Sequence, residues 1–273
     1  MNMPNTSILN NIPAQFVADN IRNISEKIQT STTRLASGKQ ITKASDNAAG
    51  ASIGLGLEID KSTSKAALTT ATQANSILAI SDGGMQNLVD IAARLKSLAA
   101  QGNSGALGAT ELGYIQNEMN ALVEQIGTVV NTTKFGETTL LDGSYSGKNF
   151  QVGTSQTDTI SINFSALDAN TLGIANLDVV NNVGGANDAL DTAIDTIKTA
   201  RAQLGALESR FNSAIENLES TINNLTAAAS EYLDADFTEV ATELANQQTQ
   251  FQAGISVLAQ VNQLTANLLK LLG

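Results

Sequence analysis

The chain has 273 residues, of which 42% are hydrophobic, but aromatic residues make up only 4% and there is no Trp, which favours closely spaced helices over one thick globular core. The formal net charge of −11 argues against a nucleic-acid binder, because phosphates call for a basic face. The absence of His and Cys removes the commonest general base, zinc ligands and thiol nucleophile, so neither an enzyme nor a protein with a metal or other cofactor is expected.

The N-terminal segment predicts a narrow amphipathic helix. Residues 1–16 have neither the basic start nor the apolar run of a secretory signal peptide, and no stretch reaches the ~18 apolar residues of a membrane span. We therefore expect no membrane partner and, for a protein that leaves the cell, export without a cleaved signal peptide. Pro13 is suited to the first helical turn and Gly38 to the stop. Between them, apolar residues spaced by three and four predict a coiled-coil seam: Ile21, Ile24, Ile28 and Leu35, with Ser31 in the same row.

The next part of the chain predicts two more helices. Ser45 or Asp46 is suited to cap a long second helix that ends in the glycine-rich residues 102–108. Within it, Gly54-Leu55-Gly56 looks like half of a dinucleotide-binding loop, but the third glycine and the preceding strand are missing, so nucleotide binding is not expected. A third helix follows, with an apolar stripe from Leu112 to Val129.

Beyond Phe135 the spacing of the apolar residues changes from a helical period to one of two residues. Strict alternation over residues 159–164 and interspersed glycines predict a small β element of one or two hairpins, at approximately 135–165, and a loop around 181–187 closes it. A long helix with a seven-residue repeat is then predicted. Its seam has a second row, also spaced by seven residues, which is polar at Arg201 and Glu208. The repeat consists of Ile197, Leu204, Phe211, Leu218, Leu225 and Tyr232.

The C-terminal segment has an apolar stripe but few charges. From Val240 to Gly273 only Glu243 and Lys270 are charged, and Gln and Asn fill much of the remainder. A solvated helix normally carries charges on its outer face, so an uncharged face indicates contact with protein on more than one side. The N-terminal stretch is similar, since Asp19 is its only charge before Arg22. The predicted stripe consists of Val240, Leu244, Phe251, Ile255, Leu258 and Leu268.

The fold expected from these patterns is mainly α, with long helices in an elongated coiled-coil bundle, a small β-hairpin element, and the N- and C-terminal helices paired. Residues 1–40 and 236–273 are expected to form a terminal coiled-coil domain, and residues 41–235 a helical-bundle domain that carries the β element.

Ordered motifs at both ends of the chain resemble those of bacterial flagellin, in a minimal form without variable outer domains. The N-terminal motifs are Arg34–Gly38, Ala44–Gly50, Ile115–Glu118, Asn131–Gly136 and Phe150–Gly153. The C-terminal motifs are Arg201–Ala206, Arg210-Phe211, Asp234–Phe237, Gln252–Gly254 and Leu258–Asn262.

This resemblance implies a structural subunit that assembles with copies of itself into an extracellular flagellar filament used for motility. It also implies contacts with the flagellar export apparatus, an export chaperone, a filament cap and hook-associated proteins. Together with the stripes, it places the filament interface at the inner wall. The predicted interface residues are Ile21, Ile24, Ile28, Leu35, Phe251, Ile255, Leu258 and Leu268.

Flagellins of some bacteria are recognised by Toll-like receptor 5, and the matching positions here are Arg94, Leu98 and Glu118. The neighbouring position that is acidic in the family pattern is Ser97. Two other functions stay open at the level of the sequence. A hook–filament junction protein resembles flagellin at both ends, and a secreted coiled-coil adhesin or binding module would show the same helical stripes.

Overall fold

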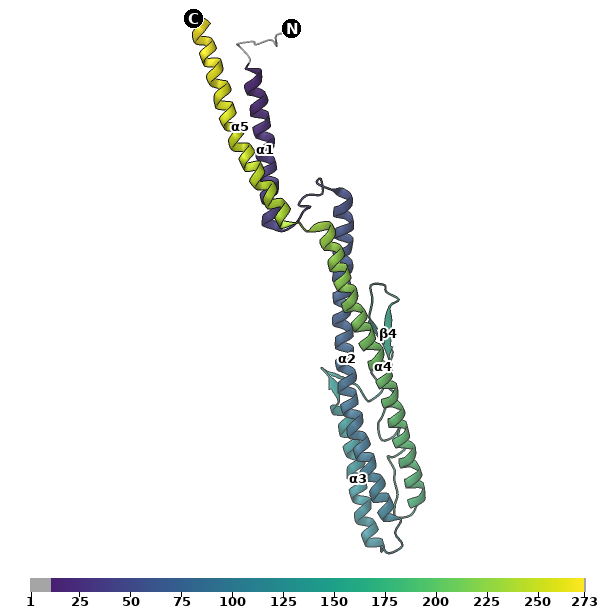
Figure 1. Cartoon of the computed structure of the whole chain (residues 1–273). Helices are drawn as coiled ribbons and strands as arrows, with labels where there is room; N and C mark the ends of the chain where they lie inside the picture. Colours follow the sequence, from purple (N-terminus) through teal and green to yellow (C-terminus); the bar gives the residue numbers. More distant parts are fainter. Residues whose placement is uncertain (1–10, 273) are drawn as a thin grey trace. The chain divides into compact units, whose positions relative to one another are not determined.

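The computed structural model describes residues 11–272, and their side chains as far as residue 267 (Figure 1). It confirms a mainly helical fold in which the terminal helices pair. The elements in chain order are α1 (Ile12–Ser37), α2 (Ala48–Gly102), α3 (Ala109–Thr132), β1 (Lys134–Phe135), β2 (Thr138–Thr139), β3 (Lys148–Gln151), β4 (Thr159–Ile162), α4 (Val183–Leu233) and α5 (Phe237–Leu272).

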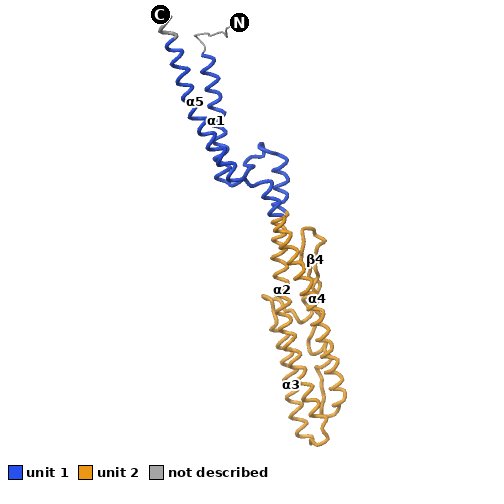
Figure 2. Tube along the Cα trace, in the orientation of Figure 1, with its two compact units in different colours: residues 1–59, 225–273 blue, residues 60–224 orange. Residues whose placement is uncertain are grey.

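The chain divides into two compact units (Figure 2). Unit 1 contains residues 1–59 and 225–273, and unit 2 contains residues 60–224. Both α2 and α4 contribute residues to the two units. Unit 1 therefore includes more of α2 and α4 than the terminal domain expected from the sequence.

Unit 2 holds the larger core, which lies among α2, α3, α4 and the β hairpins. Its largest fully buried side chains include Leu78, Met85, Leu88, Leu95, Met119, Ile126 and Phe211. The chain between β4 and α4 packs irregularly against this core and forms no further domain. Gln116 holds that segment in place: its amide donates to the Leu177 carbonyl at 2.6 Å and accepts from the Val179 N–H at 2.9 Å.

The β element consists of two antiparallel hairpins, β1–β2 and β3–β4, as the alternation predicted. In the second, Phe150 pairs with Ile160, and Ile160 and Ile162 turn inward. Phe150 also meets Phe211 of α4 edge to face, with ring centroids 6.0 Å apart, which attaches the hairpin to the helices.

The repeat of α4 packs as expected over most of its length, since Ile197, Leu204, Phe211 and Leu218 are all buried. Tyr232 departs from the repeat and is exposed. Arg201, a polar residue in the second row of the seam, donates to both carboxylate oxygens of Asp82, at 2.9 and 3.2 Å, and to the Gln86 amide oxygen at 2.6 Å. The hydrogen bond from the Arg201 guanidinium to Asp82 raises the pKa of Arg201.

Two predicted boundaries are wrong, and local hydrogen bonds explain both. Neither Ser45 nor Asp46 caps α2, because the side chain of Asn47 accepts from the Gly50 N–H at 2.9 Å and so starts the helix. The predicted loop at 181–187 is helical from Val183 onward, because Asn182 accepts from the Gly185 N–H at 3.1 Å and its carbonyl accepts from Ala186.

Unit 1 contains the antiparallel pair of α1 and α5. The direction follows from two cross-helix hydrogen bonds, Asn11 to Thr265 at 3.0 Å and Ser31 to Gln247 at 3.1 Å. Helix α1 starts at the Asn11 cap and ends at Gly38, whose φ of 68° is left-handed. Asp236 accepts from the N–H groups of Thr238 and Glu239, so it caps α5.

Backbone hydrogen bonds join the two connections of unit 1. Gln40 donates to the Leu233 carbonyl at 2.8 Å, and Ala235 donates to the Gly38 carbonyl at 3.0 Å. These bonds flank a single β-bridge between Lys39 and Asp234. The turn after α1 and the turn before α5 are therefore held side by side.

Candidate assembly interface

The seam between α1 and α5 follows a heptad on both helices. On α1 the half-buried row contains Ile21, Ile24, Ile28 and Leu35, as predicted, with Ser31 only 2% exposed among them. On α5 the row is spaced by four and three and consists of Val240, Leu244, Gln247, Phe251, Gly254, Leu258, Val261 and Thr265. This spacing is that of a coiled-coil seam.

One residue of the predicted α5 stripe lies outside the seam. Ile255 is 48% exposed, and Gly254 occupies the seam in its place. A Cβ on Gly254 would lie 3.0 Å from Cγ1 of Ile21, so the two helices approach closely here. Sequence reasoning missed Gly254 because it looked for apolar side chains, although the spacing from Phe251 to Leu258 pointed to it. The side chain of Leu268 lies outside the described residues.

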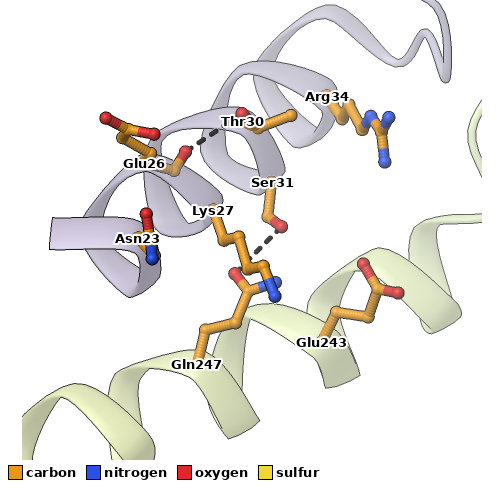
Figure 3. Close-up of a pocket in the computed structure, with 8 residues that line it drawn as sticks. All are labelled: Asn23, Glu26, Lys27, Thr30, Ser31, Arg34, Glu243 and Gln247. Atoms are coloured by element: carbon orange, nitrogen blue, oxygen red, sulfur yellow. Dashed lines mark hydrogen bonds between the residues drawn. The ribbon is translucent and has the colours of Figure 1, made fainter. Parts of the chain in front are cut away.

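Polar pairs interrupt the seam and open a shallow polar groove between α1 and α5. Figure 3 shows Ser31 of α1 pointing at Gln247 of α5, with Lys27 and Glu243 close by. Polar groups at core positions of a coiled coil fix its register at some cost in stability. The groove therefore belongs to the pairing of the two helices.

Both helices also carry apolar side chains outside the seam. At about 100° per residue, Ile255 lies on one flank of the α5 seam, and Val257 and Leu264 lie on the other. All three are exposed, as are Ile12 and Phe16 of α1. Between Glu243 and Lys270 no residue of α5 is charged. Large apolar side chains on an uncharged surface are typical of a protein–protein interface.

The residues matched to an immune-receptor surface lie in unit 2. Arg94 of α2 donates to one Glu118 carboxylate oxygen of α3 through Nη2 at 2.6 Å and through Nε at 3.2 Å, and both side chains are exposed. Leu98 is 2% exposed, and it packs in the core of the unit. It therefore offers almost no surface to a receptor, whereas Arg94 and Glu118 remain predicted contacts.

The described part of the chain was also compared with the requirements of a metal site and of a membrane span. No three His, Cys, Asp or Glu side chains that the structure describes gather closely enough to hold a metal ion. Within residues 11–272, none of the helices combines the length and apolar content that a membrane crossing requires.

Comparison with known proteins shows which proteins this chain is similar to. The family model of the bacterial flagellin N-terminal helical region matches residues 8–146, and that of the C-terminal helical region matches residues 187–272. A flagellin of Bacillus subtilis (strain 168) is 31% identical over 97% of this chain and 99% of its own length. A flagellar filament 33 kDa core protein of Treponema phagedenis is 27% identical over 97% of this chain and 99% of its own length. A crystal structure of Bacillus cereus flagellin covers 58% of this chain and 93% of its own, with a TM-score of 0.48 and 24% identity.

The chain is thus a helical structural protein with paired ends and an apolar surface on its terminal helices. It belongs to the bacterial flagellin family. It is a structural subunit that polymerises with itself into the filament of the bacterial flagellum, outside the cell. This function takes the place of the two alternatives left open by the sequence, a junction protein and an adhesin.

Proposed function

We propose that the exposed flanks of the α1–α5 pair form the contacts between subunits at the inner wall of the filament. The observation that carries this proposal is the combination of exposed Ile255, Val257 and Leu264 with the absence of charge between Glu243 and Lys270. One face of α5 packs on α1, and neighbouring subunits cover the flanks and the neutral outer face. Burial of such side chains contributes about 1.5–3 kcal/mol for each one fully removed from water.

Replacing Ile255 with Asp tests this proposal. Because Ile255 is exposed in the single chain, Ile255→Asp is expected to leave the helix content and the unfolding midpoint of the monomer close to those of the parent. In the filament the same carboxylate would be buried without a partner, at a cost of several kcal/mol. We therefore expect loss of filaments, measured by sedimentation and electron microscopy after addition of filament seeds.

Two further variants make the result specific. Val180→Asp introduces the same charge at an exposed apolar residue of unit 2 and is expected to polymerise normally. Phe251→Asp changes a half-buried seam residue and is expected to destabilise both the monomer and the filament. Filaments of normal length and yield from Ile255→Asp would show that this flank of α5 is not an interface.

The proposal extends to the partners of a filament subunit. Family membership supports export through the flagellar apparatus, a chaperone for the chain before export, and contacts with the filament cap and hook-associated proteins. The same membership supports a purely structural role without enzymatic activity. Co-purification of the unassembled chain from cells that lack the filament cap would identify the export partners by mass spectrometry.

A further inference from the structure

Unit 1 contains a small pocket beside the connection between α1 and α2. Its volume is about 220 Å³, and its apolar lining includes Ile41, Ala44, Leu55 and Leu233. Leu55 is 61% exposed, so a large apolar side chain faces water at this site. We refer to it as the loop pocket. Its lining can accept an apolar side chain of a partner.

The charged residues that line the loop pocket are Lys39, Lys43 and Glu58, so its edge has a net positive charge. Lys39 and Lys43 both line it, and neither ammonium group forms an ion pair with a described residue. An apolar lining next to two cations fits an apolar side chain that has acidic neighbours.

The same unit carries a segment in which an exposed apolar side chain has acidic neighbours. Phe237, the first residue of α5, is 69% exposed. Acidic residues lie close to it in the sequence at Asp234, Asp236 and Glu239. Asp236 accepts hydrogen bonds from the backbone N–H groups of Thr238 and Glu239, so it holds the backbone of the first turn of α5, which begins at Phe237. Phe237 does not line the pocket of its own chain.

We propose that Phe237 of one subunit occupies the loop pocket of a neighbouring copy, with Lys39 and Lys43 facing the acidic residues around it. This inference rests on the filament function and names one of its contacts in unit 1. The pocket and the side chain that fills it are different surfaces of one chain. A contact of that kind is heterologous, and its repetition from copy to copy builds an open polymer, which a self-complementary dimer contact does not.

Cross-linking between two different chains tests the contact directly, because the protein has no cysteine of its own. One variant carries Ala44→Cys in the pocket, and the other carries Thr238→Cys beside an intact Phe237. The two variants are mixed in equal amounts, polymerised with parent subunits and oxidised. We expect disulfide-linked heterodimers in the filaments and none in the mixed monomers, because a disulfide forms only where the two Cβ atoms come within about 4.5 Å. Ala36→Cys, at an exposed residue of α1 outside the pocket, replaces Ala44→Cys in the control mixture and is expected to give no heterodimer.

The outcomes separate this contact from the filament function itself. Filaments that form without the heterodimer would overturn the proposal and leave the filament function intact. A parent chain that does not polymerise even on seeds would instead contradict the function on which the proposal rests.

Charge reversal provides a second, independent measurement. Lys43→Glu or Glu239→Lys alone places like charges opposite one another, so the critical concentration for polymerisation is expected to rise about tenfold. The combination of both substitutions in one chain recreates opposite charges at every contact and is expected to restore assembly. Equal loss in the single and combined variants would contradict this pairing. The helix content of each monomer, which is expected to stay unchanged, serves as the folding control.

Discussion

Two glycines of α2, Gly54 and Gly56, have opposite surroundings although they lie two positions apart. A Cβ on Gly54 would come within 2.4 Å of Cδ2 of Leu233, whereas a Cβ on Gly56 would meet nothing within 4 Å. Both lie inside a continuous helix, so the Gly-Leu-Gly sequence does not form a loop. Gly54 instead permits the close approach of α2 and the C-terminal end of α4.

This difference predicts opposite effects of the same substitution. Gly56→Ala is expected to stabilise unit 1 by up to ~1 kcal/mol, because Ala is the better helix former. Gly54→Ala gains the same propensity but forces its methyl group into Leu233, so a net loss of about 1–2 kcal/mol is expected. Urea unfolding followed by circular dichroism measures both. Equal effects at the two positions would show that Leu233 does not pack against Gly54.

Asp142 organises the turn between β2 and β3. Its carboxylate accepts from the Ser144 hydroxyl at 2.6 Å, from the Ser144 N–H at 2.9 Å and from the Thr139 hydroxyl. These hydrogen bonds, that from the Ser144 side chain foremost, lower the pKa of Asp142. Gly143 follows with a φ of 81°, a conformation that glycine adopts without strain.

The lowered pKa predicts a dependence of stability on acid. Since the folded state binds the proton less tightly than the unfolded state, the stabilisation is fully present above pH ~4 and is lost as the pH falls through the lower, folded pKa. Asp142→Asn removes the titrating group and is expected to flatten the fall in the unfolding midpoint of unit 2 between about pH 4 and pH 2. Midpoints that fall in parallel for the parent and the variant would assign the acid sensitivity to other carboxylates.

At the scale of single elements, the Ser31–Gln247 bond is the feature that most clearly sets the register of α1 against α5. Ser31 is the residue of α1 that is buried among those described, and its hydroxyl donates to the Gln247 side chain across the seam. A shift of one heptad would bring Ser31 opposite Val240 or Gly254, neither of which has a side chain that accepts a hydrogen bond. The polar pair therefore favours one alignment.

A double-mutant cycle measures this contribution. Ser31→Ala and Gln247→Leu are each expected to cost about 1 kcal/mol, because each leaves a polar partner unsatisfied. The combined variant is expected to cost less than the sum of the two, with a coupling of about 0.5–1.5 kcal/mol. Strictly additive effects would show that the two side chains do not interact in solution.

The helices themselves were largely predictable, because their apolar periodicity is local information. The α1 row and most of the α4 repeat lie in the structure where the spacing placed them. The errors came from contacts that the periodicity does not contain. Asn47 and Asn182 decide where α2 and α4 begin, and the residues Val183-Gly184-Gly185 look like a loop although they are helical. Ile255 was predicted in the apolar stripe because its side chain is apolar. That Gly254 takes the seam position becomes visible only when α5 is packed against α1. The pairing of Phe237 with a pocket depends on surfaces that no single-chain pattern describes.

At the scale of the whole molecule, burial is distributed unequally between the two units. The core of unit 2 includes buried side chains from α2, α3, α4 and the second hairpin. In unit 1 the buried apolar side chains that the structure describes are Ala229, Leu233 and Val240, and the α1–α5 seam is only half-buried. Because burial of apolar surface is the main stabilising contribution, we expect unit 1 to be the less stable part of the monomer.

This inequality predicts that polymerisation protects unit 1 selectively. In the monomer, backbone amides of α1 and α5 are expected to exchange with solvent at least ~100-fold faster than those of α3 and the middle of α4, a difference of about 2.7 kcal/mol in opening free energy. In the filament, neighbouring subunits bind only the folded helices, so the amides of α1 and α5 are expected to become as protected as those of unit 2. Hydrogen–deuterium exchange with mass spectrometry of monomers and sheared filaments reads both states from the same peptides. The peptides of α3 serve as the internal reference, because their protection already comes from the core of unit 2. Equal protection of α1 and α3 in the monomer would mean that the seam is stable without neighbours, and unchanged protection of α1 and α5 in filaments would place the subunit contacts outside these helices.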